Sequence, residues 1–94
     1  MANFKNQKVI HTGTTATYEF PDVVEGDKGT TWTVVNAGTG DITISRASGA
    51  TPNFSKLVTS SNPSSLTGLT LAKGGTIEMV VTAADTITCF GSGF

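Results

Sequence analysis

The sequence predicts an all-β fold, either an antiparallel β-sandwich or a jelly-roll-like barrel of about seven or eight short strands. The composition is the first reason: threonine is very abundant, and 11 of the 94 residues are glycine. Threonine and other β-branched residues favour strands, and glycine favours turns. Short runs that alternate apolar and polar residues are the second reason, because they recur along the chain between Gly-rich or Pro-containing links.

The chain is short enough for a single domain. Residues 1–13 are mostly polar and predict an N-terminal arm or an edge strand, and residues 14–94 then form one β domain. A domain of this size has a thin core and commonly gains stability from disulfides, metals or self-association. Cys89 is the only cysteine and His11 the only histidine. An internal disulfide and a Cys/His metal site are therefore excluded, and we expect self-association.

Alternating runs place the strands in the first half of the chain. Residues 14–20 carry apolar side chains at every second position and stop at Pro21, which cannot donate to a ladder. The next two runs, residues 30–36 and 41–46, flank a Gly-rich link and predict a β-hairpin.

The second half begins with a long loop. Residues 47–65 have the composition of loops, which is typical of insertions or interface elements when the segment is this long. Three further alternating runs follow, at Leu69, Ile77 and Ile87, and tight turns join them.

Charge and hydropathy exclude several classes of partner. The formal net charge is −1 and only 14% of the residues are charged, so no basic stripe predicts nucleic-acid binding. No apolar run is long enough for a membrane span, and the first residues contain no apolar signal-peptide region. We therefore expect a protein that is synthesised in a cytoplasm, without a membrane or nucleic-acid partner.

No residue pattern predicts catalysis. His11 has no acidic or cysteine neighbour in the sequence, and Cys89 shares a strand face with Ile87, which is typical of a small buried hydrophobe. The spacings of phosphate-binding and calcium-binding loops are missing. Trp32 and Tyr18 could form a sugar-stacking platform, but their positions on apolar strand faces favour core packing. We expect no enzyme activity, no cofactor and no bound metal.

Aromatic residues outside the predicted core are candidates for contacts. Phe90 lies on the strand face opposite Ile87, and Phe94 follows a Gly-Ser-Gly link, so both are predicted to contact another subunit. Phe4 lies in the polar N-terminal arm with Lys5, and the arm is predicted to dock onto a partner surface.

Four segments together resemble a class of small β domains in virion proteins of tailed bacteriophages. The segments are YEFPD (18–22), KGTTWTVVNAGTGDITI (28–44), LTLAKGGTIEMV (69–80) and DTITCFG (85–91). They cover most of residues 14–94. One departure is that such domains often end with an aromatic pair, whereas Thr88, Cys89 and Phe90 stand here.

The resemblance implies a structural part of a virion. Similar domains occur in capsid decoration (cement) proteins, head fibres and tail-fibre modules, and a free-standing module with a short arm favours a decoration protein. Such a protein binds the outer capsid surface and stabilises the head. We expect a homotrimer in the virion that contacts the major capsid protein, with Phe4, Lys5 and Lys8 as the capsid-contact candidates. The alternative is a tail-fibre or head-fibre tip that binds host surface receptors through residues 47–65.

Overall fold

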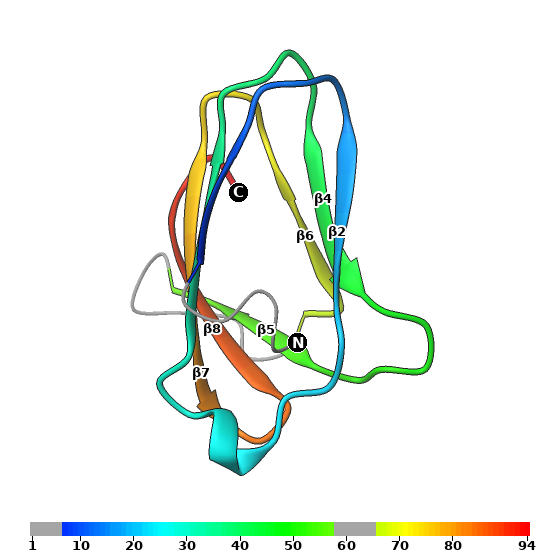
Figure 1. Cartoon of the computed structure of the whole chain (residues 1–94), viewed down its shortest axis with the longest axis vertical. Helices are drawn as coiled ribbons and strands as arrows, with labels where there is room; N and C mark the ends of the chain where they lie inside the picture. The colour runs from blue at the N-terminus through cyan, green and yellow to red at the C-terminus, as the bar shows by residue number, and fades with distance from the viewer. Residues whose placement is uncertain (1–6, 58–65) are drawn as a thin grey trace.

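The computed structural model describes residues 7–57 and 66–94, which form two β-sheets packed face to face (Figure 1). The elements are β1 (Gln7–His11), β2 (Ala16–Phe20), the 3-10 turn η2 (Glu25–Asp27), β3 (Thr31–Asn36), β4 (Ile42–Arg46), β5 (Asn53–Lys56), β6 (Gly68–Leu71), β7 (Thr76–Ala83) and β8 (Thr86–Ser92). One sheet has the order β1-β3-β7-β8-β5, and the other has the order β2-β4-β6. The predicted all-β sandwich is confirmed.

The core lies between the two sheets and follows from the alternation in the sequence. Alternate apolar positions of the strands face inward, and β7 shows the pattern clearly, with Ile77, Met79 and Val81 at 0–1% exposure. An aromatic group joins the sheets. Phe20 meets Trp32 and Phe54 edge to face, at ring-centroid distances of 5.2 Å and 6.0 Å.

Three short links carry the chain from one sheet to the other, and each forms a β-arch, in which the two flanking strands face each other across the core. The links are residues 12–15, 37–41 and 72–75, which lie together at one end of the sandwich (Figure 1). The first two are stacked, because Ala37 N donates to His11 O over 2.8 Å and Thr39 N donates to Gly13 O over 3.0 Å.

The predicted hairpin of residues 30–36 and 41–46 is wrong. The corresponding strands lie in different sheets, where β3 pairs with β1 and β7, and β4 pairs with β2 and β6. A Gly-rich link can turn the chain back beside itself or across the core, and both turns bury the same alternating residues. Strand alternation therefore does not distinguish a hairpin from a β-arch.

The sheets are mixed rather than wholly antiparallel. The pairs β1–β3, β2–β4 and β5–β8 are parallel. Two of these pairs follow from the stacking of the first β-arch on the second, because stacked arches that run in the same direction pair both of their strands in parallel. The pair β7–β8 is a hairpin, and its turn contains Asp85 at φ 52°.

Strand β5 forms inside the segment predicted as a long loop. Its register pairs Phe54 with Ile87, and Phe54 is fully buried. A run of only four residues between polar segments gives a weak strand pattern, so the sequence does not reveal it. Of the predicted loop, residues 58–65 lie outside the described residues.

The sandwich is closed along one side and open along the other. On the closed side, Phe54 N donates to Leu66 O over 2.9 Å and Leu66 N donates to Phe54 O over 3.0 Å, which links β5 to the segment entering β6. On the open side, β1 and β2 are the edge strands of their sheets. The two sheets of the sandwich thus stay apart between β1 and β2, and we call this gap the mouth.

Candidate functional site

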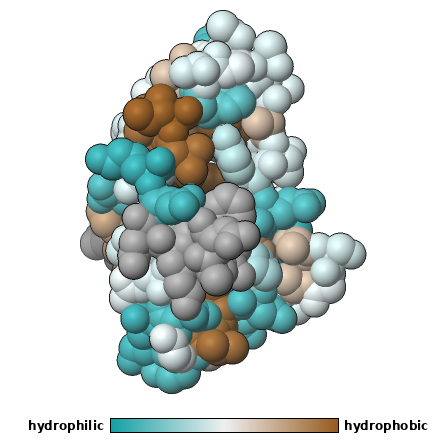
Figure 2. Space-filling view, in the orientation of Figure 1, coloured by the Kyte–Doolittle hydropathy of each residue, from teal (hydrophilic) through white to brown (hydrophobic). Residues whose placement is uncertain are grey.

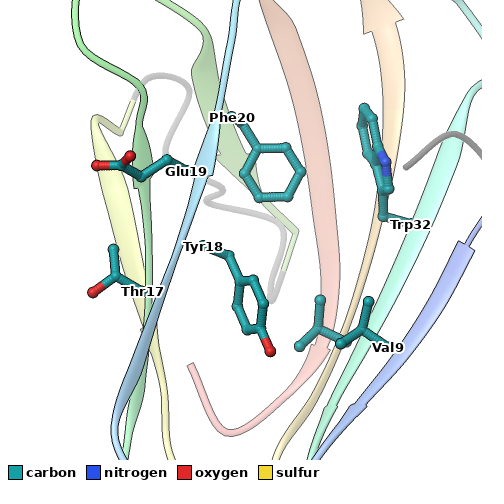
Figure 3. A pocket seen from close by; sticks show the side chains of 7 residues that line it. Val9, Thr17, Tyr18, Glu19, Phe20 and Trp32 are labelled. Atoms are coloured by element: carbon teal, nitrogen blue, oxygen red, sulfur yellow. The ribbon is translucent and has the colours of Figure 1, made fainter. Parts of the chain in front are cut away.

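A hollow of about 310 Å³ lies between the sheets at the mouth. Its lining residues come from the edge strands and from β3, and they are Val9, Thr17, Tyr18, Glu19, Phe20, Trp32 and Val34. Figure 3 shows Tyr18 and Phe20 of β2 pointing toward Val9 and Trp32, whereas the side chains of Thr17 and Glu19 point away from the sandwich interior. The inner walls of the hollow are therefore apolar.

His11 supports Tyr18 at the rim of the hollow. The Tyr18 hydroxyl lies 3.4 Å from His11 Nδ1, and the two rings meet edge to face with an interplanar angle of 88°. The other ring nitrogen, Nε2, lies 2.5 Å from the carbonyl oxygen of Thr14, so the first link orients the imidazole. This histidine therefore has a packing role at the end of β1.

The indole N–H of Trp32 does not supply a polar contact to the hollow. Its Nε1 is buried without a hydrogen-bond partner among the described residues. In Figure 3 this nitrogen lies on the ring edge that faces away from Tyr18 and Phe20. The hollow thus presents mainly aromatic and aliphatic surface, which suits an apolar side chain rather than a polar ligand.

Some backbone polar groups of β2 point into the mouth, away from β4, its one partner among the described strands. In a parallel ladder, the N–H and C=O groups of one residue bond the same neighbouring strand, and those of the next residue point the other way. Ala16 N donates to Asp41 O, and Phe20 O accepts from Ala47 N, so Ala16 and Phe20 bond toward β4. The backbone groups of Thr17 and Glu19 therefore face the mouth.

The same argument applies to β1. His11 O accepts from Ala37 N, so His11 and Val9 bond toward β3. The backbone groups of Lys8 and Ile10 therefore face the mouth, and both side chains lie on the outer surface, where Ile10 is 62% exposed.

The structure separates the predicted contact residues. Lys8 is exposed on β1, whereas Phe4 and Lys5 lie outside the described residues. Phe90 is 40% exposed on the outer face of the five-stranded sheet, opposite Glu78 in the β7–β8 ladder. Phe94 packs against the core, with Lys56 Nζ 5.6 Å from its ring centroid, so less of its surface is free than the sequence predicts.

Metal ligands and the one cysteine were candidates for chemistry in the described residues. Within residues 7–57 and 66–94, no group of three His, Cys, Asp or Glu side chains is placed to hold a metal ion. Burial raises the pKa of the Cys89 thiol to about 12, which keeps it protonated and poorly nucleophilic. In the same part of the chain, no helix has the length and apolar character to cross a membrane.

Comparisons with protein families, with curated proteins and with solved structures find no match to this chain. The site therefore rests on its own geometry.

The sequence analysis missed the open edge, although one signal for it exists. The segment Val9–Thr14 (VIHTGT) resembles Val34–Thr39 (VVNAGT), and the two segments are the stacked ends of the first and second β-arches. A repeat of this kind predicts parallel stacking of similar units, and the first unit then has no neighbour on its outer side.

Proposed function

We propose that this chain is a bacteriophage capsid decoration protein that binds the outer capsid surface and stabilises the head, acting as a homotrimer in the virion. The resemblance of the four sequence segments supports this class. The geometric observation that carries the proposal is the position of β1, because residues 1–6 lead directly into an edge strand on which Lys8 and Ile10 are exposed.

Such a role requires adhesion rather than chemistry. A sandwich whose outer face is rich in threonine, with exposed Phe90 among polar residues, provides a stable platform for contacts. Many copies on a capsid lattice add up to strong binding even when each contact is modest.

Copy number in the particle tests the proposal. Quantitative mass spectrometry of purified virions of the phage that encodes this chain should find the protein at a ratio of about one to one with the major capsid protein, since a shell-wide lattice needs many copies. A few copies per particle would contradict a decoration role, and absence from the particle would contradict any virion role.

Truncation tests the contact of the arm with the capsid. Val9 packs against the core, so the deletion should end at residue 6 and leave β1 in place. We expect loss of residues 1–6 to lower occupancy on decorated capsids while the thermal unfolding temperature stays the same. Lys73→Ala, in an exposed turn, controls for the loss of one lysine charge. Unchanged occupancy would reject the arm as the contact.

A second candidate is a fibre tip that binds host receptors, and the loop of residues 47–52, which hydrogen bonds fasten at its end, favours it. Thr51 donates to Asp22 Oδ1 through its backbone N over 2.7 Å, and Arg46 Nε donates to Pro52 O over 2.7 Å. Figure 1 shows this loop protruding beside β2 and β4. Binding of the isolated domain to host cells, lost in Asp22→Ala, would favour this alternative.

A further inference from the structure

Two strand edges that pair with no other described strand lie on the same side of the molecule and run in opposite directions. Strand β1 ends one sheet, β2 ends the other, and the first link reverses the chain between them (Figure 1). Figure 2 views the molecule from this side and shows apolar surface over the course of β1, with hydrophilic surface around it. Exposed edges of this kind are templates for pairing with another strand.

Both edge strands are short and each carries one charge, Lys8 or Glu19, but two other protective features, proline and a bulge, are missing from them. Pro21 follows β2 rather than interrupting it, and neither edge strand has a bulge in its register. The hollow behind the edge is lined by Val9 and Tyr18, so the interior is also incompletely filled there. Both features indicate that the mouth is completed by another chain.

We propose that the mouth is a self-association interface, in which β1 of one copy pairs antiparallel with β2 of a second copy. With Lys8 placed opposite Glu19 of the second copy, Ile10 falls opposite Thr17 of that copy. These are the four residues whose N–H and C=O groups face the mouth. Both pairs can therefore exchange two hydrogen bonds, as hydrogen-bonded positions of an antiparallel ladder do.

The side chains agree with the same register. Lys8 and Glu19 both lie on the outer face, so the pair places opposite charges side by side, which is favourable across strands. Val9 then lies opposite Tyr18 of the second copy. Both of these residues face inward, so the seam continues the apolar core from one copy to the next.

Charge favours this pairing over a symmetric alternative. In the symmetric alternative, β1 pairs with β1 of the second copy, or β2 pairs with β2. Lys8 would then lie opposite Lys8 or Ile10, and Glu19 would lie opposite Glu19 or Thr17. Neither register brings opposite charges together, and like charges directly opposite each other are unfavourable.

A rotation axis parallel to the strands produces the proposed seam. Rotation about such an axis keeps the strand directions and brings the β2 edge of each copy to the β1 edge of the next copy. A two-fold or three-fold axis of this kind closes the ring as a dimer or a trimer. The inference does not depend on the capsid role, since the seam forms between isolated molecules in solution.

Analytical ultracentrifugation of the full chain and of variants with reversed charges at Lys8 and Glu19 tests the inference. We expect a concentration-dependent dimer or trimer, and Lys8→Glu or Glu19→Lys should each raise its dissociation constant about tenfold. The double variant Lys8→Glu/Glu19→Lys should restore the value of the unmodified chain, because each seam regains an opposite pair. Lys73→Glu makes the same charge change in an exposed turn and should have no effect. A monomer at every concentration would overturn the inference, and so would a double variant that stays weak.

Cysteine pairing identifies the strands in contact. Opposite residues in a hydrogen-bonded antiparallel pair have Cα atoms about 5.5 Å apart, which is within the range of a disulfide. Under mild oxidation, a mixture of the Lys8→Cys and Glu19→Cys variants should form a crosslinked dimer, and neither variant should do so alone. Cys89 is buried and will not compete. Crosslinking of Lys8→Cys alone would show β1–β1 pairing and overturn the proposed seam.

Discussion

The side chain of Asn36 connects three parts of the molecule at the end of β3. Its Nδ2 donates to Gly40 O over 2.9 Å and to Leu71 O over 3.0 Å, and its Oδ1 accepts from Gly38 N over 3.1 Å. The residue is fully buried. One amide thus shapes the second link and fastens it to β6, which is a structural rather than a chemical role for a buried polar group.

We predict that Asn36→Ala lowers the free energy of unfolding by about 3 kcal/mol, because it leaves buried backbone groups without partners. Urea denaturation followed by Trp32 fluorescence would measure the change. Thr39→Ala removes an exposed side chain from the same link and should change stability by less than about 0.5 kcal/mol. Similar losses in the two variants would show that the link, rather than the amide, is responsible.

Cys89 gives a prediction about reactivity and pH. Burial raises the pKa of its thiol from 9.0 to about 12, so a thiol-reactive dye at about pH 8 should label the folded protein far more slowly than the chain in denaturant. The thiol pKa is higher in the folded state than in the unfolded state. The contribution of this group to the free energy of unfolding is therefore fully present below about pH 9 and is lost as the pH rises toward 12. Fast labelling of the folded protein would contradict the burial.

At the scale of elements, the sequence predicts most strands but not their partners. Alternation places the strands around residues 14–20, 30–36 and 41–46, since burial on one face demands it. Pairing depends instead on whether a link turns beside its strand or across the core. The resemblance between Val9–Thr14 and Val34–Thr39 carries that information, because similar links stack on one another.

Stacking of the first two links requires glycine at position 38. A Cβ at this position would lie 2.2 Å from the carbonyl oxygen of Gly13, so Gly38→Ala must force the two backbones apart. We expect a loss of about 3 kcal/mol in unfolding free energy, measured by urea denaturation.

Gly26→Ala, in the turn η2, is the matched control for Gly38→Ala, because nothing lies within 4 Å of a Cβ at position 26. It should change stability by less than about 1 kcal/mol. Equal destabilisation of the two variants would contradict the stacked arrangement of the links.

For the whole molecule, composition and alternation are sufficient to predict a small all-β sandwich, but not the open mouth. Lys8 and Phe90 are predicted as surface residues and are exposed, and Trp32 is predicted to lie in the core and is buried. Burial depends on the residue and its strand face, which the sequence shows. Whether a strand is an edge depends on the order of all strands, so the roles of Thr17 and Glu19 follow only from the fold.

Strand order across the whole molecule predicts its pattern of amide hydrogen exchange. Amides of β3 and β7 lie inside the five-stranded sheet and should exchange only on global unfolding. Those of Lys8, Ile10, Thr17 and Glu19 face the mouth and should exchange rapidly in dilute solution. At higher protein concentration, self-association through β1 and β2 should protect these four amides, because each gains a carbonyl partner on the second copy.

NMR-detected exchange at two concentrations measures the change, and the amide of the exposed turn residue Lys73 is the internal control. Protection of the four amides at every concentration would mean that the same chain covers the edge. Fast exchange at every concentration would mean that nothing pairs with it.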